Sequence, residues 1–186
     1  MDIKSIGIVG SGQMGNGIAQ VAANFGFNVV MMDVSGAALE KAMATVSGSC
    51  DRIIKKGGMT EADKAALLGR IKTAQETSAL KDCDIVIEAA TENIDLKLKI
   101  FKDLDAVVKP SALLVSNTSS ISITKIAGVT KRPDKVAGMH FMNPVPLMKL
   151  VEGIRGLQTS DETFKAVKAL AEKMDKVFVE SDRKST

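Results

Sequence analysis

A glycine-rich run near the start of the chain has the residue types and spacing of a phosphate-binding turn. It consists of Gly10, Ser11, Gly12, Gln13, Met14 and Gly15, which fit the pattern G-x-G-x-x-G. Between a strand and a helix, the first glycine makes the turn, the second lets the main chain approach a pyrophosphate, and the third allows close packing. The first N–H groups of the helix then face the phosphates. The run therefore predicts a dinucleotide site.

Asp33 follows Gly15 by eighteen residues and is expected to end the next strand. A carboxylate at that place can accept both ribose hydroxyls of an adenosine and would repel a 2′-phosphate. The pair of features favours NAD over NADP.

His140 is the only histidine of the chain, and Glu152 follows twelve residues later. Imidazole takes up and releases a proton near neutral pH, which suits a general base. If the strands that end at these residues are neighbours, Glu152 can accept the other ring N–H and fix the tautomer. The alternatives are a structural histidine and a surface glutamate.

Two further polar residues have both a chemical and a structural interpretation. Ser119, in the polar loop 117–120, can donate a hydroxyl to a substrate oxygen that gains negative charge, although serine is also common in ordinary turns. Asn143 precedes Pro144, which favours extended backbone. That backbone suits a fixed amide donor and equally suits a plain loop.

The elements that must position these residues alternate between apolar strands and amphipathic helices, which indicates an α/β fold with a Rossmann-type, doubly wound, mostly parallel sheet. Helices are expected from the glycine turn to Phe25, from Ser35 as N-cap to Gly57, from Thr60 to Leu68, and over 95–108, 124–127 and 163–174. Strands are expected over 3–9, 27–32, 71–74, 84–89, 113–116, 135–139, 148–152 and 177–179.

Composition excludes several classes of protein. The 186 residues are 45% hydrophobic and 25% charged, enough for a buried core. A net charge of +3 is too small for a typical nucleic-acid binder but suits a partner that carries phosphates. Cys50 and Cys83 lack metal-ligand spacing, so we expect no metal and reduced thiols. We also expect no signal peptide, no membrane span and a cytoplasmic protein.

Five stretches together resemble the 3-hydroxyacyl-CoA dehydrogenase family, in order and spacing, over essentially the whole chain. They are the glycine run, Glu88-Ala89-Ala90-Thr91-Glu92-Asn93, Ser116-Asn117-Thr118-Ser119-Ser120, His140-Phe141-Met142-Asn143-Pro144 and Met148-Lys149-Leu150-Val151-Glu152. In length and style the chain is most similar to the short bacterial 3-hydroxybutyryl-CoA dehydrogenases of that family.

The resemblance implies a role for each matching position. Gly10 to Gly15 and Asp33 would hold the dinucleotide, with Glu92 and Lys97 on its nicotinamide side. Ser119 and Asn143 would border the nicotinamide and the acyl group. His140 would be the catalytic base and Glu152 its carboxylate partner. Ser49 and Lys56, together with Ser119, would contact coenzyme A.

Ser49, Arg52 and Lys56 fall on one face of the helix expected after Asp33, opposite its apolar stripe. Ser49 and Lys56 lie about 10 Å apart along the helix axis at 1.5 Å per residue. Such a stripe could meet the phosphates of coenzyme A. A solvated helix face would look the same.

The resemblance implies an oxidoreductase that transfers a hydride between NAD(H) and C3 of a short-chain 3-hydroxyacyl-CoA, such as 3-hydroxybutyryl-CoA, in fatty-acid or butyrate metabolism. Alternatives are an NAD-binding module with weak or no catalysis, a dehydrogenase of hydroxy acids or sugar nucleotides on the same fold, and a regulatory or structural protein.

The end of the sequence departs from the family, which continues with a Pro-Gly-Phe turn, an Asn-Arg pair and a helical, dimer-forming domain that supplies an active-site asparagine. Residues 180–186 carry none of these. We therefore expect one NAD-binding domain over 1–179, a short polar tail over 180–186, and no helical domain. We also expect weak or absent turnover by this chain, and self-association through the surface left exposed.

Overall fold

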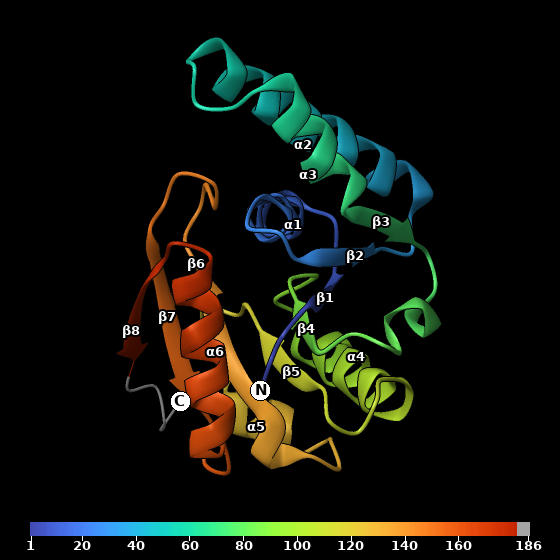
Figure 1. Ribbon diagram of the computed structural model, residues 1–186. Helices are drawn as coiled ribbons and strands as arrows, with labels where there is room; N and C mark the ends of the chain where they lie inside the picture. The colour runs from blue at the N-terminus through green and yellow to red at the C-terminus, as the bar shows by residue number, and fades with distance from the viewer. Residues whose placement is uncertain (182–186) are drawn as a thin grey trace.

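The computed structural model describes residues 1–181 and shows one eight-stranded sheet with the strand order β3-β2-β1-β4-β5-β6-β7-β8 (Figure 1). The strands are β1 (Ser5–Val9), β2 (Asn28–Met32), β3 (Ile71–Ala74), β4 (Ile85–Glu88), β5 (Leu113–Ser116), β6 (Val136–Phe141), β7 (Leu150–Arg155) and β8 (Val177–Ser181). Neighbouring strands are parallel except β6 and β7, which are antiparallel. The expected α/β class and mostly parallel sheet are confirmed.

The helices cover both faces of this sheet, and each face has its own apolar core. One core packs side chains of α1 (Gln13–Asn24), α2 (Gly36–Lys55), α3 (Glu61–Gly69) and α6 (Asp161–Lys173) against the sheet. The other packs α4 (Ile94–Val107), α5 (Ile123–Ala127) and the 3-10 turn η1 (Thr77–Leu80). A second 3-10 turn, η2, spans Pro133–Lys135. Figure 1 shows α2 and α3 side by side beyond α1, at the top of the molecule.

Local sequence signals set several element boundaries as expected. The Ser35 hydroxyl accepts a hydrogen bond from Ala38 N and caps α2. Thr60 and Asp63 form a reciprocal capping box at the start of α3. The expected strands 71–74 and 113–116 match β3 and β5. Caps and strands of this kind depend on neighbours in sequence, which is why the pattern alone located them.

Other boundaries differ because tertiary contacts decide them. β7 covers Leu150–Arg155 rather than 148–152, since Met148 N bonds to Pro144 O in a turn. β8 continues to Ser181 because it pairs with β7, so the polar tail expected from 180 begins inside a strand. Residues 182–186 lie outside the described part of the chain. Phe25, the expected last residue of the first helix, is the C-cap of α1 and is 44% exposed.

Within residues 1–181, the structure contains no helix that is both long and apolar enough to span a membrane.

The glycine turn allows a test that separates packing from open space. A Cβ added at Gly15 would lie 1.9 Å from the carbonyl oxygen of Gly10, whereas one added at Gly12 would meet nothing within 4 Å. We expect Gly15→Ala to lower the free energy of unfolding by about 2 kcal/mol or more, as overpacking against backbone does. Gly12→Ala should lower it by about 1 kcal/mol or less, through its weaker N-cap. Urea denaturation measures both, and equal losses would contradict this packing.

Candidate active site

The glycine run leaves the start of α1 open to an anion. Gly10 has a positive φ of 97°, a conformation that glycine adopts readily. Gly12 is the N-cap residue, and it makes no side-chain capping bond, while the first turn of α1 contains no acidic residue. The first N–H groups of a helix lack acceptors within it. An exposed main chain without a Cβ at Gly12, next to such donors, fits a pyrophosphate.

Asp33 directly follows β2, beside the glycine turn, and its carboxylate is held by three hydrogen bonds. Its Oδ2 accepts from the Ser11 amide at 2.9 Å and from the Ser11 hydroxyl at 2.8 Å, and its Oδ1 accepts from Ser35 N at 3.0 Å. Burial alone would raise the pKa of Asp33, but these bonds outweigh burial and lower its pKa. The Asp33 carboxylate is therefore a fixed anion at neutral pH, which suits an acceptor of hydrogen bonds from ribose hydroxyls.

The sheet order places these two features at its switch point. β1 lies between β2 and β4, so the connections that leave β1 and β4 run to opposite faces of the sheet. In open α/β sheets, ligands bind in the crevice outside the carboxyl ends of the strands at such a point. The residues present therefore fit a dinucleotide.

A buried polar cluster lies under this crevice, at the carboxyl ends of β4 and β5. Lys97 of α4 pairs with Glu88, and both side chains are almost fully buried. The Ser116 hydroxyl donates to Glu88 Oε2 at 2.9 Å and accepts from Lys97 Nζ at 3.3 Å. Glu88 Oε1 accepts from Ala90 N at 2.9 Å. The cluster ties the loop after β4 to the ends of both strands.

The Lys97 side chain, which was expected on the nicotinamide side of the cofactor, belongs to this cluster. The residue is 1% exposed and its ammonium bonds to Glu88 and Ser116, and its contact with the cofactor stays a prediction. A charge buried away from water is stable only when it is paired. Because α4 points the Lys97 side chain inward, its ammonium needs the carboxylate of Glu88. Lys97 therefore helps to hold the ends of β4 and β5 that border the crevice.

Glu92 links the loops that follow β4 and β5. Its carboxylate accepts from the Thr118 hydroxyl at 2.8 Å and from the Ser119 amide at 3.4 Å. Ser119 and Glu92 are both exposed at this edge of the sheet. The sequence placed both residues near the nicotinamide, and the structure brings them together.

His140 and Glu152 face each other across the antiparallel pair β6–β7. The two residues are direct partners in the strand register. His140 Nδ1 and Glu152 Oε2 are 2.9 Å apart, and the side chains are 18% and 24% exposed. The Asn117 amide oxygen accepts from Phe141 N at 2.8 Å, which ties the end of β6 to the loop after β5. A half-buried imidazole in contact with a carboxylate is therefore present at the end of β6.

A groove of about 420 Å³ lies between α1, α2 and the loop that joins β6 to β7. Ser49, Arg52 and Lys56 of α2 line one side, and residues 143–147 of the loop line another. The Gln20 amide donates to the Ser49 hydroxyl at 2.9 Å, which leaves the Ser49 proton free to donate to a ligand. Three sequence-predicted residues, Ser49, Lys56 and Asn143, thus share one groove.

Sequence reasoning missed the residues that hold the site from behind. Glu88 and Ser116 end neighbouring strands, a position that carried a detectable signal. Asn117, Gln20 and the bond from Ser11 to Asp33 carried none, because their partners lie far away in sequence. Within residues 1–181, no group of three or more His, Cys, Asp or Glu side chains is placed to hold a metal ion.

A sequence model described as "3-hydroxyacyl-CoA dehydrogenase, NAD binding domain" matches residues 5–184. The chain is 51% identical over 97% of its length to a 3-hydroxybutyryl-CoA dehydrogenase of Bradyrhizobium diazoefficiens, and 51% identical over 97% to a probable one of Bacillus subtilis. It spans 61% and 63% of those relatives. It also resembles the crystal structure of (S)-3-hydroxybutyryl-CoA dehydrogenase from Ralstonia eutropha, with a TM-score of 0.95 and 58% identity over 96% of this chain and 63% of that one.

The buried cluster predicts a large stability loss when only one of its charges is removed. Lys97→Met should lower the free energy of unfolding by about 3–5 kcal/mol, because it leaves Glu88 charged and unpaired. Adding Glu88→Gln should restore part of that loss, since glutamine can still accept from Ala90 and donate to Ser116. Double-mutant cycles in urea measure this coupling.

Lys99→Met is the matched control on the same helix. Its ion pair with Asp103 is exposed, so the loss should be about 0.5 kcal/mol or less. Additive losses for Lys97→Met and Glu88→Gln would refute the coupling.

Proposed function

This chain belongs to the 3-hydroxyacyl-CoA dehydrogenase family through its NAD-binding domain, and we propose that it transfers a hydride between NAD(H) and C3 of a short-chain 3-hydroxyacyl-CoA. The observation that carries the proposal is the 2.9 Å contact between His140 and Glu152. His140 lies three residues before Asn143, which lines the groove between α1 and α2. The names of the relatives support 3-hydroxybutyryl-CoA as the substrate, and its oxidation at C3 would give acetoacetyl-CoA.

His140 serves as the base in this proposal. With its Nδ1–H donated to Glu152, the ring keeps Nε2 as the nitrogen that can accept a proton. In the direction of oxidation, Nε2 would take the proton of the C3 hydroxyl group, and NAD, when bound, would supply the acceptor for the hydride from C3. Glu152 stabilises the imidazolium that forms and holds the ring in place. The product is the 3-oxoacyl-CoA.

Ser119 and Asn143 take the substrate side of the same reaction. The Ser119 hydroxyl lies just past β5. In reduction, the reverse of the reaction above, negative charge develops on the substrate oxygen, and this hydroxyl would donate a hydrogen bond to that oxygen. Glu92 holds the Ser119 amide, so it would fix the position of that hydroxyl. The Asn143 amide sits at the entrance of the groove, where it would border the nicotinamide and the acyl group.

The groove between α1 and α2 would receive coenzyme A. Ser49 has a hydroxyl proton to donate, and Arg52 and Lys56 lie one and two turns further along α2. Their positive charges suit the phosphates of the ligand. The mild net charge of the whole chain fits attraction of such a polyanion.

Since the chain spans about three fifths of these relatives, its own rate of turnover is part of the proposal. We expect NADH binding by the 186 residues with slow reduction of acetoacetyl-CoA. NADH fluorescence titration measures binding, and single-turnover NADH oxidation measures chemistry. A role in fatty-acid or butyrate metabolism, a cytoplasmic location and self-association stay predictions.

Asp33→Ala tests the cofactor site. Removing the carboxylate should raise the Kd for NADH about 10- to 100-fold, as loss of charged hydrogen bonds does. The Kd for NADPH should change far less, because the repulsion of its 2′-phosphate is lost as well. Asp103→Ala, on the exposed face of α4, is the control and should bind like the parent. Unchanged NADH affinity in Asp33→Ala would contradict this placement of the ribose.

His140→Ala tests the chemical step. The single-turnover rate of acetoacetyl-CoA reduction should fall about 10²- to 10⁴-fold, the usual effect of losing a general acid or base. Glu152→Gln should give a smaller fall, because the ring stays but loses its charged partner. NADH affinity should stay within about twofold in both variants, since neither residue binds the cofactor. A His140→Ala rate equal to that of the parent would remove the assignment.

A further inference from the structure

The loop between β6 and β7 forms one wall of the groove but has little internal support. Residues 143–147 line the groove, and His140 and Glu152 flank the loop in the two strands. Pro144 and Pro146 have no N–H to donate. The bonds inside the loop run from Leu147 N and Met148 N to the same acceptor, Pro144 O, each at 3.0 Å. Contacts from outside must therefore fix the shape of this wall.

Lys176, in the turn between α6 and β8, supplies such a contact. Its ammonium donates to Val145 O at 2.6 Å and to Met148 O at 2.7 Å, and the residue is 7% exposed. The two carbonyls lie three residues apart in the loop, so one side chain fixes both ends of its turn. Buried carbonyls left without such a donor would be destabilising.

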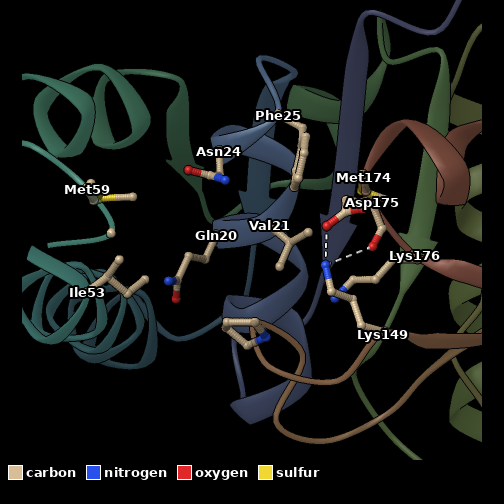
Figure 2. A pocket seen from close by; sticks show the side chains of 12 residues that line it. Gln20, Val21, Asn24, Phe25, Ile53, Met59, Lys149, Met174, Asp175 and Lys176 are labelled. Carbon is tan, nitrogen blue, oxygen red and sulfur yellow. Dashed lines mark hydrogen bonds and ion pairs between the residues drawn. The ribbon is translucent and has the colours of Figure 1, made fainter. Parts of the chain in front are cut away.

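Lys176 is a buried cation rather than a surface lysine. Burial lowers its pKa, as does the charge of Lys149, while Asp175 raises it. Lys149 pairs with Asp175 beside it, but those side chains are 62% and 65% exposed. Exposed pairs of this kind contribute little. Figure 2 shows Lys149, Asp175 and Lys176 gathered on one side of a cavity of about 240 Å³, opposite Gln20 and Val21 of α1.

The other side of the loop rests on α1. Val145 is 2% exposed, and a Cβ added at Gly17 would lie 2.9 Å from Val145 Cβ. The cavity of Figure 2 and the groove are neighbours, because both are lined by Gln20, Ile53, Gly58 and Pro146. The loop is thus held between α1 and Lys176.

We propose that Lys176 is a positioning residue for acyl-CoA: by holding the carbonyls of Val145 and Met148, it sets the wall of the groove that carries Asn143. The inference rests on the proposed function only for the identity of the ligand. Lys176 faces the cavity behind the groove, so its effect reaches the ligand through the loop. It also makes the acyl-CoA site depend on the turn after α6, because Lys176 lies 31 residues further along the chain than Val145.

The test compares two lysines that join the same loop to the same turn. Lys176→Met should raise the Kd for acetoacetyl-CoA about tenfold or more, which corresponds to one hydrogen bond lost or misplaced. The Kd for NADH should rise by a smaller factor, because the glycine turn and Asp33, which would hold the pyrophosphate and the ribose, lie outside this loop and only Asn143 would border the nicotinamide. Lys149→Met, which removes the exposed contacts with Asp175, should leave both constants unchanged. Isothermal titration calorimetry with each ligand measures them.

Two further variants keep the test decisive if Lys176→Met folds poorly. Lys176→Arg keeps a charged donor and should recover most of the affinity for acetoacetyl-CoA, whereas Lys176→Gln should recover less. An affinity for acetoacetyl-CoA that matches the parent in folded Lys176→Gln or Lys176→Met overturns the positioning role. Equal weakening of NADH would also overturn it, by indicating a general structural effect. If the parent binds NADH but no acetoacetyl-CoA, the proposed function fails instead.

Discussion

The antiparallel return of β7 beside β6 is the constraint on which the candidate site depends. Strands β1 to β6 run parallel, so their carboxyl ends meet at one edge, whereas β7 and β8 run the opposite way. The reversal at β7 places Glu152 directly opposite His140, although the residues are twelve positions apart. The same reversal creates the short loop that walls the groove. A parallel β7 would have carried Glu152 away from the imidazole and required a long crossover in place of the loop.

The edge of the sheet is organised by carboxylates that receive hydrogen bonds from neighbouring loops. Asp33 is held by Ser11 and Ser35, Glu88 by Lys97 and Ser116, and Glu92 by the loop after β5. Each carboxylate joins two segments that the strands bring to one place. Groups fixed in this way need little reorganisation when a charged ligand or transition state appears, which is how a rigid sheet favours catalysis.

The resemblance of motifs gave the family and most of the residues at the crevice, and local patterns gave the order of strands and helices. The limits of the sequence appear where partners are distant. The sequence carries no sign that Lys97 is buried against Glu88, because this depends on α4 turning that side chain toward the sheet. The sequence carries no signal for Lys176, since a lysine after a helix is usually solvated. Its two carbonyl acceptors come from the loop between β6 and β7, which only the tertiary packing brings close.

Residue types and their spacing already indicate the chemistry that is available: a glycine turn that would suit a pyrophosphate, an acid that would suit a ribose, an imidazole and a basic helix face. Those features depend on residue type and on spacing within a single element, so they can be read along the chain. Tertiary structure alone decided which groups meet. Side chains from separate segments are brought together by the strand order, the direction of β7 and the faces of α1, α2 and α4. The pairs that result are His140–Glu152, Gln20–Ser49 and Lys97–Glu88.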